Sequence, residues 1–184
     1  MVVSVVLPSS VSSVLTSASL VGFSGSRSSV PSVAASVAEL VASHVAWESA
    51  AGCHVPILVG CAAGVDRFFR GYFPSAQVFS VSGSSRGALA ARSVSFVSAL
   101  ASSGGVLVSF PSSPCPVGLL PSSSGSRAFS GFGSGSWASL AFAVGRGVQC
   151  FVFAPFGVPT GWGFSPCGDG WFSFTPCGSQ LGLF

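Results

Sequence analysis

Residues 22–27 (Gly-Phe-Ser-Gly-Ser-Arg) have the types and spacing needed to bind an anion. An apolar run beginning at Leu20 leads into this stretch, and Pro31 follows it at a position where helices commonly begin. A glycine-rich turn between a strand and a helix directs backbone N–H groups and the helix N-terminus at a bound anion. Arg27 adds a planar charged donor at the same place. The stretch therefore predicts a nucleotide or phosphate site.

Two further small-residue turns are placed in a similar way. Residues 60–66 (Gly-Cys-Ala-Ala-Gly-Val-Asp) follow the apolar run 55–60, and residues 133–136 (Gly-Ser-Gly-Ser) precede an apolar helical pattern. A single glycine turn is weak evidence, because every α/β protein needs tight turns. Three such turns at one edge of a sheet, together with nearby arginines, favour a phosphate-binding edge.

The charged residues are few and point to the same class of ligand. All seven basic side chains are arginine, and the acids are Glu39, Glu48, Asp66 and Asp169. Even if all four acids pair with arginine, three of the seven arginines lack a carboxylate and can face solvent or an anion such as phosphate. The net charge of +3 is too small for a broad nucleic-acid footprint.

Asp66 is the only acid near the proposed edge, so it is the only candidate there for a catalytic general base or a ribose-binding carboxylate. The simpler interpretation is a residue stabilised by the dipole at the start of a helix. The residues predicted to bind the nucleotide or phosphate are Gly22, Ser24, Gly25, Ser26, Arg27, Gly60, Ala62, Gly64, Arg86, Arg92, Gly133, Gly135 and Ser136.

The cysteines and histidines predict neither a metal site nor a cofactor. The six cysteines form no C-x-x-C motif, and His44 and His54 are not spaced with them as zinc ligands. Buried reduced thiols are the favoured interpretation for Cys61 and Cys150, which lie in or beside apolar strand-like runs. In the tail, a disulfide between Cys167 and Cys177 is the alternative.

The composition is unusually apolar, with 49% hydrophobic and 6% charged residues. Arginine, proline or clusters of glycine and serine nevertheless interrupt every window of about 20 residues, so we expect no membrane-spanning helix. The first 20 residues carry no basic residue before their apolar part, which argues against a secretory signal. We therefore expect a cytoplasmic protein, and its low surface charge favours a homodimer or a larger homo-oligomer.

The hydrophobic pattern alternates between strands and helices. Strands are predicted at 20–24, 55–60, 77–81, 106–110 and 149–154, and helices at 31–47, from the second turn to about 72, at 88–101 and around 137–145. This order implies an α/β, Rossmann-like, doubly wound fold, whose mostly parallel sheet has about five or more strands and helices on both faces. Ligands bind such sheets outside the carboxyl ends of the strands.

The domain organisation follows from this pattern. Residues 20–154 are predicted to form the nucleotide-binding domain, and the long loop 111–135 within it is expected to be a functional lid or disordered. Residues 1–19 are an extension of uncertain structure that can contain an edge strand. Residues 155–184 are an aromatic, Gly- and Pro-rich tail that covers a sheet edge or packs on one face of the same domain.

The order of these motifs resembles the SLOG superfamily, which includes the DNA-processing protein A family and the "lonely guy" phosphoribohydrolases. Residues 22–27 resemble its first motif, residues 60–66 a G-x-A-x-G-x-D turn, and residues 133–136 a phosphate-binding G-x-G-T turn. Residues 86–92 and 106–111 resemble the arginine-bearing helix and following strand of a small bacterial branch. The resemblance spans 20–154 and implies a nucleotide or nucleotide-derived ligand.

Three functions remain open from the sequence. The resemblance favours binding of a nucleotide, because Ser139 stands where the phosphoribohydrolases carry a catalytic glutamate. An N-glycosidase or a phosphoribosyl-type hydrolase or transferase that uses Asp66 is the first alternative. A single-stranded DNA-binding protein is the second, although the chain lacks lysine and the expected basic groove with aromatic platforms.

Overall fold

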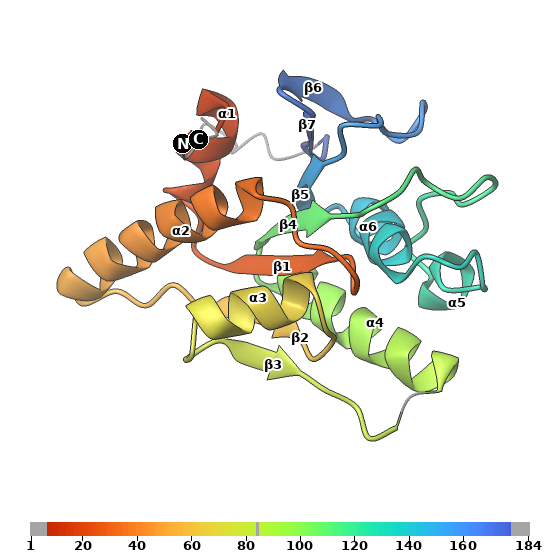
Figure 1. The fold of residues 1–184 in the computed structure, drawn as a ribbon, viewed down its shortest axis with the longest axis horizontal. Coiled ribbons are helices and arrows are strands. Elements are labelled where there is room, and N and C mark those ends of the chain that lie inside the picture. Colours follow the sequence, from red (N-terminus) through yellow and green to blue (C-terminus); the bar gives the residue numbers. More distant parts are fainter. Residues whose placement is uncertain (1–6, 84, 178–184) are drawn as a thin grey trace, which may run out of the picture.

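The computed structural model describes residues 7–83 and 85–177, and it is built around a seven-stranded sheet (Figure 1). The strands lie in the order β3-β2-β1-β4-β5-β7-β6. The first five pair in parallel, and β7 and β6 are antiparallel to their neighbours. Their bounds are β1 Val21–Gly25, β2 Ile57–Gly60, β3 Gln77–Phe79, β4 Val106–Phe110, β5 Gln149–Phe153, β6 Ser165–Gly168 and β7 Trp171–Phe174.

Helices connect the parallel strands, as crossover connections in parallel sheets require. The helices are α1 Ser9–Leu15, α2 Val33–Ala50, α3 Val65–Tyr72, α4 Arg86–Ser102, α5 Gly125–Ala128 and α6 Gly135–Gly145. The predicted α/β fold with a mostly parallel sheet is confirmed. The five predicted strands are all present, and β3 ends two residues earlier than expected because only residues 77–79 pair with β2.

Alternate residues of the central strands enter two separate hydrophobic clusters. Phe23 of β1 and Val108 of β4 join a cluster with buried residues of α1, α2 and α3. Leu107 of β4 and Cys150 of β5 join a second cluster with buried residues of α4 and α6. Successive side chains of a strand point to opposite faces of the sheet, so the sheet separates the two clusters. The sequences of β2 and β4 are near-continuous apolar runs because both faces of these strands are buried.

The N-terminal segment differs from the expected edge strand. Residues 9–15 form α1, and Val11 and Leu15 are fully buried in the cluster that contains α2. Valine alternating with serine gives no helical period, so contacts with α2 and the sheet, rather than local propensity, hold this helix. Residues 1–6 lie outside the described part of the chain.

The tail covers one edge of the sheet, which is one of the two predicted arrangements. β7 pairs with β5, and β6 pairs with β7 through a register shift at Pro166 and Gly168. Trp171 and Trp162 of this tail are almost completely buried, so both pack in the apolar interior. A proline and a bulge on the outer strand discourage pairing with a further strand.

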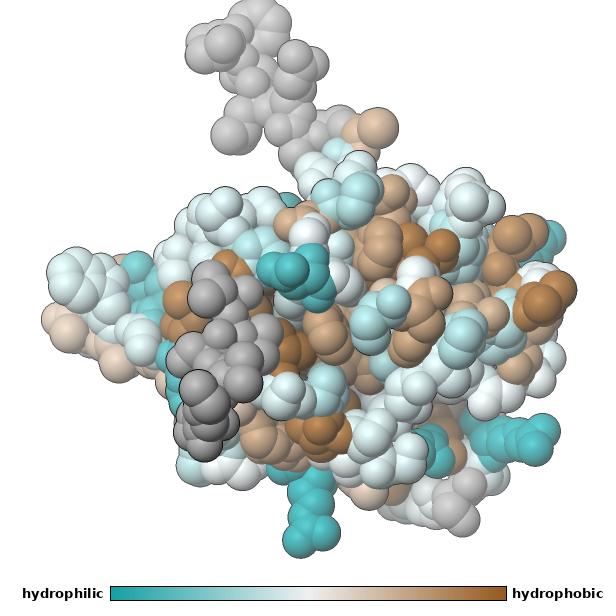
Figure 2. Space-filling model, turned by 45° about the horizontal axis from the view of Figure 1, so that its top comes forward, coloured by the Kyte–Doolittle hydropathy of each residue, from teal (hydrophilic) through white to brown (hydrophobic). Residues whose placement is uncertain are grey.

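No helix in the described ranges is long and apolar enough to cross a membrane. Figure 2 shows pale, weakly polar residues and brown apolar ones over most of one face, with strongly hydrophilic side chains only at scattered points. The low charge content of the sequence is thus visible on this surface.

Candidate functional site

A cavity of about 470 Å³ lies at the carboxyl end of the central strands. Its lining comes from the ends of β1 and β2, the segment after β4, one side of α4, and the segment from Ala128 into α6. The strand order reverses between β1 and β4, because β2 and β3 continue on one side of β1 and β4 and β5 on the other. Ligands bind α/β sheets at such a switch point, and the volume suits a small organic ligand.

The first wall is the turn after β1, which is held by backbone contacts. The Ser26 N–H donates to the carbonyl oxygen of Phe110 at 2.9 Å, and the Val65 N–H donates to the carbonyl oxygen of Ser26 at 2.9 Å. A Cβ at Gly25 would lie 2.6 Å from the Phe110 oxygen, so only glycine fits there. The Ser26 hydroxyl accepts from the N–H groups of Ser28 and Ser29 at 3.1 and 3.3 Å. The conformation of the turn is therefore fixed by contacts within the protein.

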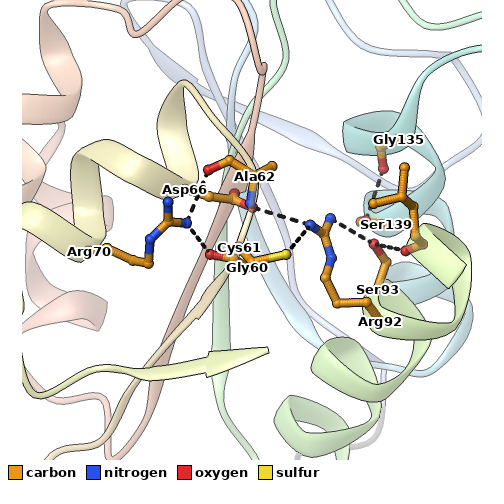
Figure 3. A network of polar contacts seen from close by, with 10 residues as sticks. Gly60, Cys61, Ala62, Asp66, Arg70, Arg92, Ser93, Gly135 and Ser139 are labelled. Carbon is orange, nitrogen blue, oxygen red and sulfur yellow. Dashed lines mark hydrogen bonds and ion pairs between the residues drawn. The ribbon is translucent and has the colours of Figure 1, made fainter. Parts of the chain in front are cut away.

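The second wall is the turn between β2 and α3. Gly64 has a φ of 64°, and a Cβ there would overlap the carbonyl oxygen of Ser26. A Cβ at Gly60 would overlap the Asp66 carboxylate, so this glycine lets the carboxylate lie against the end of β2. Arg70 donates to the carbonyl oxygens of Gly60 and Ala62 at 2.6 and 3.0 Å and fixes the turn from behind (Figure 3).

Asp66 is buried at the first turn of α3 and lines the cavity. Its Oδ2 accepts from the Ala62 N–H at 3.2 Å and lies 3.9 Å from the Arg92 guanidinium. Burial raises the pKa of Asp66 above its ordinary value of 3.8, while the charge of Arg92 and the Ala62 hydrogen bond act in the opposite direction. The position of the carboxyl group makes it a candidate to accept a proton, or a hydrogen bond from a hydroxyl group of a ligand.

Arg92 lies between the turn that follows β2 and the N-terminal part of α6 (Figure 3). It comes from α4 and reaches Asp66 and the Cys61 sulfur on one side and the Ser93 hydroxyl on the other. Its contacts to Cys61 and Ser93 are both 3.4 Å long. The guanidinium lowers the pKa of the Cys61 thiol. Because its contacts are long, Arg92 has donors that an anion in the cavity can attract.

The third wall is the N-terminus of α6. Ser134 caps the helix, since its hydroxyl accepts from the Trp137 N–H at 3.4 Å and its carbonyl from the Ala138 N–H at 3.0 Å. The first N–H groups of a helix have no partner within the helix. Among the described residues, the amides of Gly135 and Ser136 stay open, and both residues line the cavity. This is the arrangement that the sequence predicts for an anion.

Most of the predicted site residues come together in this cavity. Those that line it are Ser24, Gly25, Ser26, Arg27, Gly60, Ala62, Asp66, Arg86, Arg92, Gly133, Gly135 and Ser136. Gly22 and Gly64 do not line it. A Cβ at Gly22 would lie 2.7 Å from Leu100, and Gly64 lies against the turn after β1, so both glycines serve close packing.

Several lining residues are not among the predicted ligands. Ser112 and Ser113 follow β4, Ser139 lies in α6, and Phe129 and Phe132 belong to the segment before α6. The position of Ser112 two residues after a predicted strand is a signal for the same sheet edge. Nothing in the local sequence marks Phe132, because it lies in a long segment without hydrophobic periodicity. That segment contains the unpredicted short helix α5.

The described residues contain no group of three or more histidine, cysteine, aspartate or glutamate side chains that could hold a metal ion. Their six cysteines are all free, which leaves the alternative Cys167–Cys177 disulfide unformed. Comparisons with protein-family models, curated proteins and solved structures find no match to this chain. The site is therefore interpreted from its own geometry.

Proposed function

We propose that this protein binds a nucleotide or a nucleotide-derived ligand in the cavity at the carboxyl edge of its sheet. The observation that carries the proposal is the convergence of three arginines with the open N-terminus of α6. Arg27, Arg86 and Arg92 line the same cavity as Gly135 and Ser136. Guanidinium groups and helix N-termini are the groups that proteins use to hold phosphate.

The charge balance of the cavity supports an anionic ligand. Among the residues that the structure describes, Asp66 is the only acid that lines it, so three arginines share the cavity with one carboxyl group. That carboxyl group already lies 3.9 Å from Arg92. Arg27 and Arg86 are exposed, and neither forms an ion pair among the residues that the structure describes. A ligand with one or two phosphate groups would restore the balance.

The size and composition of the cavity support a ligand larger than phosphate alone. Its volume of about 470 Å³ falls in the range of small-molecule sites. Serine hydroxyls are frequent in the lining, and Ser24, Ser93, Ser112 and Ser113 are examples. Hydroxyl groups both donate and accept, which suits a ribose or the edge of a base. A sugar phosphate that carries a base fits these features.

Thermal unfolding with a panel of nucleotides tests the proposal. We expect a stabilising ligand to raise the unfolding temperature of the wild-type protein. Arg27→Ala should remove most of this effect, because it deletes a guanidinium from the cavity wall. Arg146→Ala is the matched control, since Arg146 is exposed, lies over Phe142 and does not line the cavity. A panel with no stabilising phosphate compound would contradict the proposal.

Cleavage or transfer at an N-glycosidic bond is the second candidate function. The position of Asp66 favours it, because a carboxyl group with a raised pKa in a ligand-sized cavity can move a proton. Release of free base from nucleosides and nucleotides should occur with the wild-type protein and fall sharply in Asp66→Asn. Equal rates for the two proteins would remove any catalytic role for Asp66.

Two further parts of the proposal concern the location and the oligomeric state of the protein. We propose a cytoplasmic protein that self-associates as a homodimer or a larger homo-oligomer, as its low surface charge favours.

Binding of single-stranded nucleic acid is the less favoured alternative, since the arginines line a cavity of limited size rather than a long groove. A salt-dependent electrophoretic shift of single-stranded DNA would support that alternative instead.

A further inference from the structure

Phe132 is an aromatic side chain that the hydrophobic core does not use. Its exposed fraction is 38%, and neither hydrophobic cluster of the described residues includes it. Several other large aromatic residues, such as Phe23 and Trp137, are fully buried. Phe132 nevertheless lines the cavity that contains the arginines. Its position at the cavity, rather than its exposure alone, lets the ring contact a bound ligand.

The backbone around Phe132 is built to present this ring. Gly131 and Gly133 flank it with φ angles of 105° and 88°, which residues with a side chain rarely adopt. A Cβ at either glycine would meet nothing within 4 Å, so their backbone angles, and not a lack of space, call for glycine. On one side the ring lies near Gly118, where an added Cβ would be 3.4 Å from Cε1. The ring is thus supported at one edge and open to the cavity.

Phe132 is close enough in the chain to the anion site for one nucleotide to reach both. Phe132 precedes Gly135 by three residues, which separates their Cα atoms by at most about 11 Å. A phosphate at the amides of Gly135 and Ser136 would place its attached sugar and base within reach of the ring. Leu89 and Phe129 add apolar surface, and Ser112 adds a hydroxyl, to the same cavity.

We propose that Phe132 is the stacking platform for the nucleobase of a bound nucleotide whose phosphate lies at the N-terminus of α6. This inference rests on the proposed function and specifies which part of the ligand each group recognises. An aromatic ring stacks on any base through its π face, with little preference among bases. The site then recognises both an aromatic base and a phosphate, so it binds sugar phosphates that lack a base more weakly.

Calorimetric titration with two probes, adenosine monophosphate and ribose 5-phosphate, separates the two parts of the site. Phe132→Ala should weaken binding of adenosine monophosphate roughly 5- to 150-fold, as expected for loss of one stacked base. Its affinity for ribose 5-phosphate should stay within about twofold of wild type, because no base is lost. Phe132→Tyr should restore binding of adenosine monophosphate, since tyrosine keeps the stacking face.

Phe156→Ala is the control, because Phe156 has the same exposed fraction of 38% and lies outside this cavity. It should leave both affinities unchanged. If Phe132→Ala changes neither affinity, or weakens both probes equally, the stacking role is wrong while the phosphate site stands. If the wild-type protein binds neither probe, the proposed function fails and the stacking role fails with it.

Discussion

Asp66 shows how neighbouring backbone positions set the properties of one side chain. Gly60 leaves space for the carboxylate, the Ala62 N–H donates to it, and Arg92 supplies a nearby positive charge. Desolvation by burial still has the largest effect and raises the pKa of Asp66. The sequence predicts this residue at the start of a helix near the site. It does not reveal the degree of burial, which depends on how α4, the next helix along the chain, packs beside Asp66.

The raised pKa of Asp66 predicts a pH-dependent contribution to stability. Because the folded state holds this proton more tightly than the unfolded state, the contribution is fully present below the unfolded value of about 3.8 and is lost as pH rises through the folded pKa. The free energy of unfolding of wild type relative to Asp66→Asn should therefore fall with rising pH, by up to about 1.4 kcal/mol per pH unit.

Urea denaturation of wild type and Asp66→Asn over this pH range measures the difference. The difference should level off once Asp66 is ionised in both states. A difference that increases with pH would show that Arg92 and the Ala62 N–H outweigh burial, and that the pKa of Asp66 is lowered instead.

The glycines of the first two motif turns differ in the segments against which they pack. Gly25 allows the end of β1 to approach Phe110 of β4, and Gly64 allows the turn before α3 to approach the turn after β1. Gly60 leaves space for the Asp66 carboxylate. Gly22 instead faces α4, where Leu100 and Phe96 fill the space that a side chain would need. The sequence identifies all four as members of glycine-rich turns. Which of them faces a ligand depends on packing between distant segments, so it could not be predicted.

Gly22→Ala should therefore destabilise the fold without altering the ligand groups. An added Cβ would lie 2.7 Å from Leu100 Cδ1 and 3.0 Å from Phe96 Cζ, and such overpacking costs about 1–3 kcal/mol. Gly71→Ala in α3 is the matched control, because nothing lies within 4 Å of its added Cβ. That substitution should be neutral or stabilise by up to about 1 kcal/mol through helix propensity.

Chemical denaturation of the two variants measures both effects, and the binding of a nucleotide to folded Gly22→Ala should match that of wild type. Equal stability of Gly22→Ala and Gly71→Ala would contradict the packing role. A loss of affinity in folded Gly22→Ala would instead support the original prediction that Gly22 belongs to the binding site.

The long periodic elements were the most predictable parts of the fold. Runs such as 106–110 and the helical pattern before Gly145 identify their elements locally, because burial repeats with the period of the structure. α1 and α5 carry no such period and depend on packing against other elements. β6 and β7 are short and lie in a segment rich in turn residues. Their strand structure arises from the pairing of β7 with β5 and of β6 with β7.

For the whole molecule, the tail completes the sheet. Without it, β5 would be an open edge strand with a large apolar surface beside it. Trp171 of β7 is buried to 1% exposure and packs edge-on against Phe110 and at a tilt against Phe153. The tail is thus part of the core and not an appendage, which links residues more than 140 positions apart, such as Val21 and Trp171, in one cluster.

Trp171→Ala should lower the free energy of unfolding by about 3–5 kcal/mol, because it removes a large buried side chain. Trp171→Phe should cost much less, since its ring fills part of the space. The Trp171 indole N–H also has no hydrogen-bond partner among the described residues, so phenylalanine removes an unsatisfied buried donor. Denaturation midpoints measure both variants, and equal losses would show that the indole N–H has an essential partner.

The central claim is that phosphate binds where the first turn of α6 meets the arginines at the carboxyl edge of the sheet. Nuclear magnetic resonance of the ¹⁵N-labelled protein during titration with adenosine monophosphate tests it most directly. The account predicts that the largest amide shifts occur at Gly135 and Ser136, with smaller shifts in the turn after β1, and that Arg146→Ala preserves them. Unchanged amides at Gly135 and Ser136, or shifts confined to another part of the surface, would contradict it.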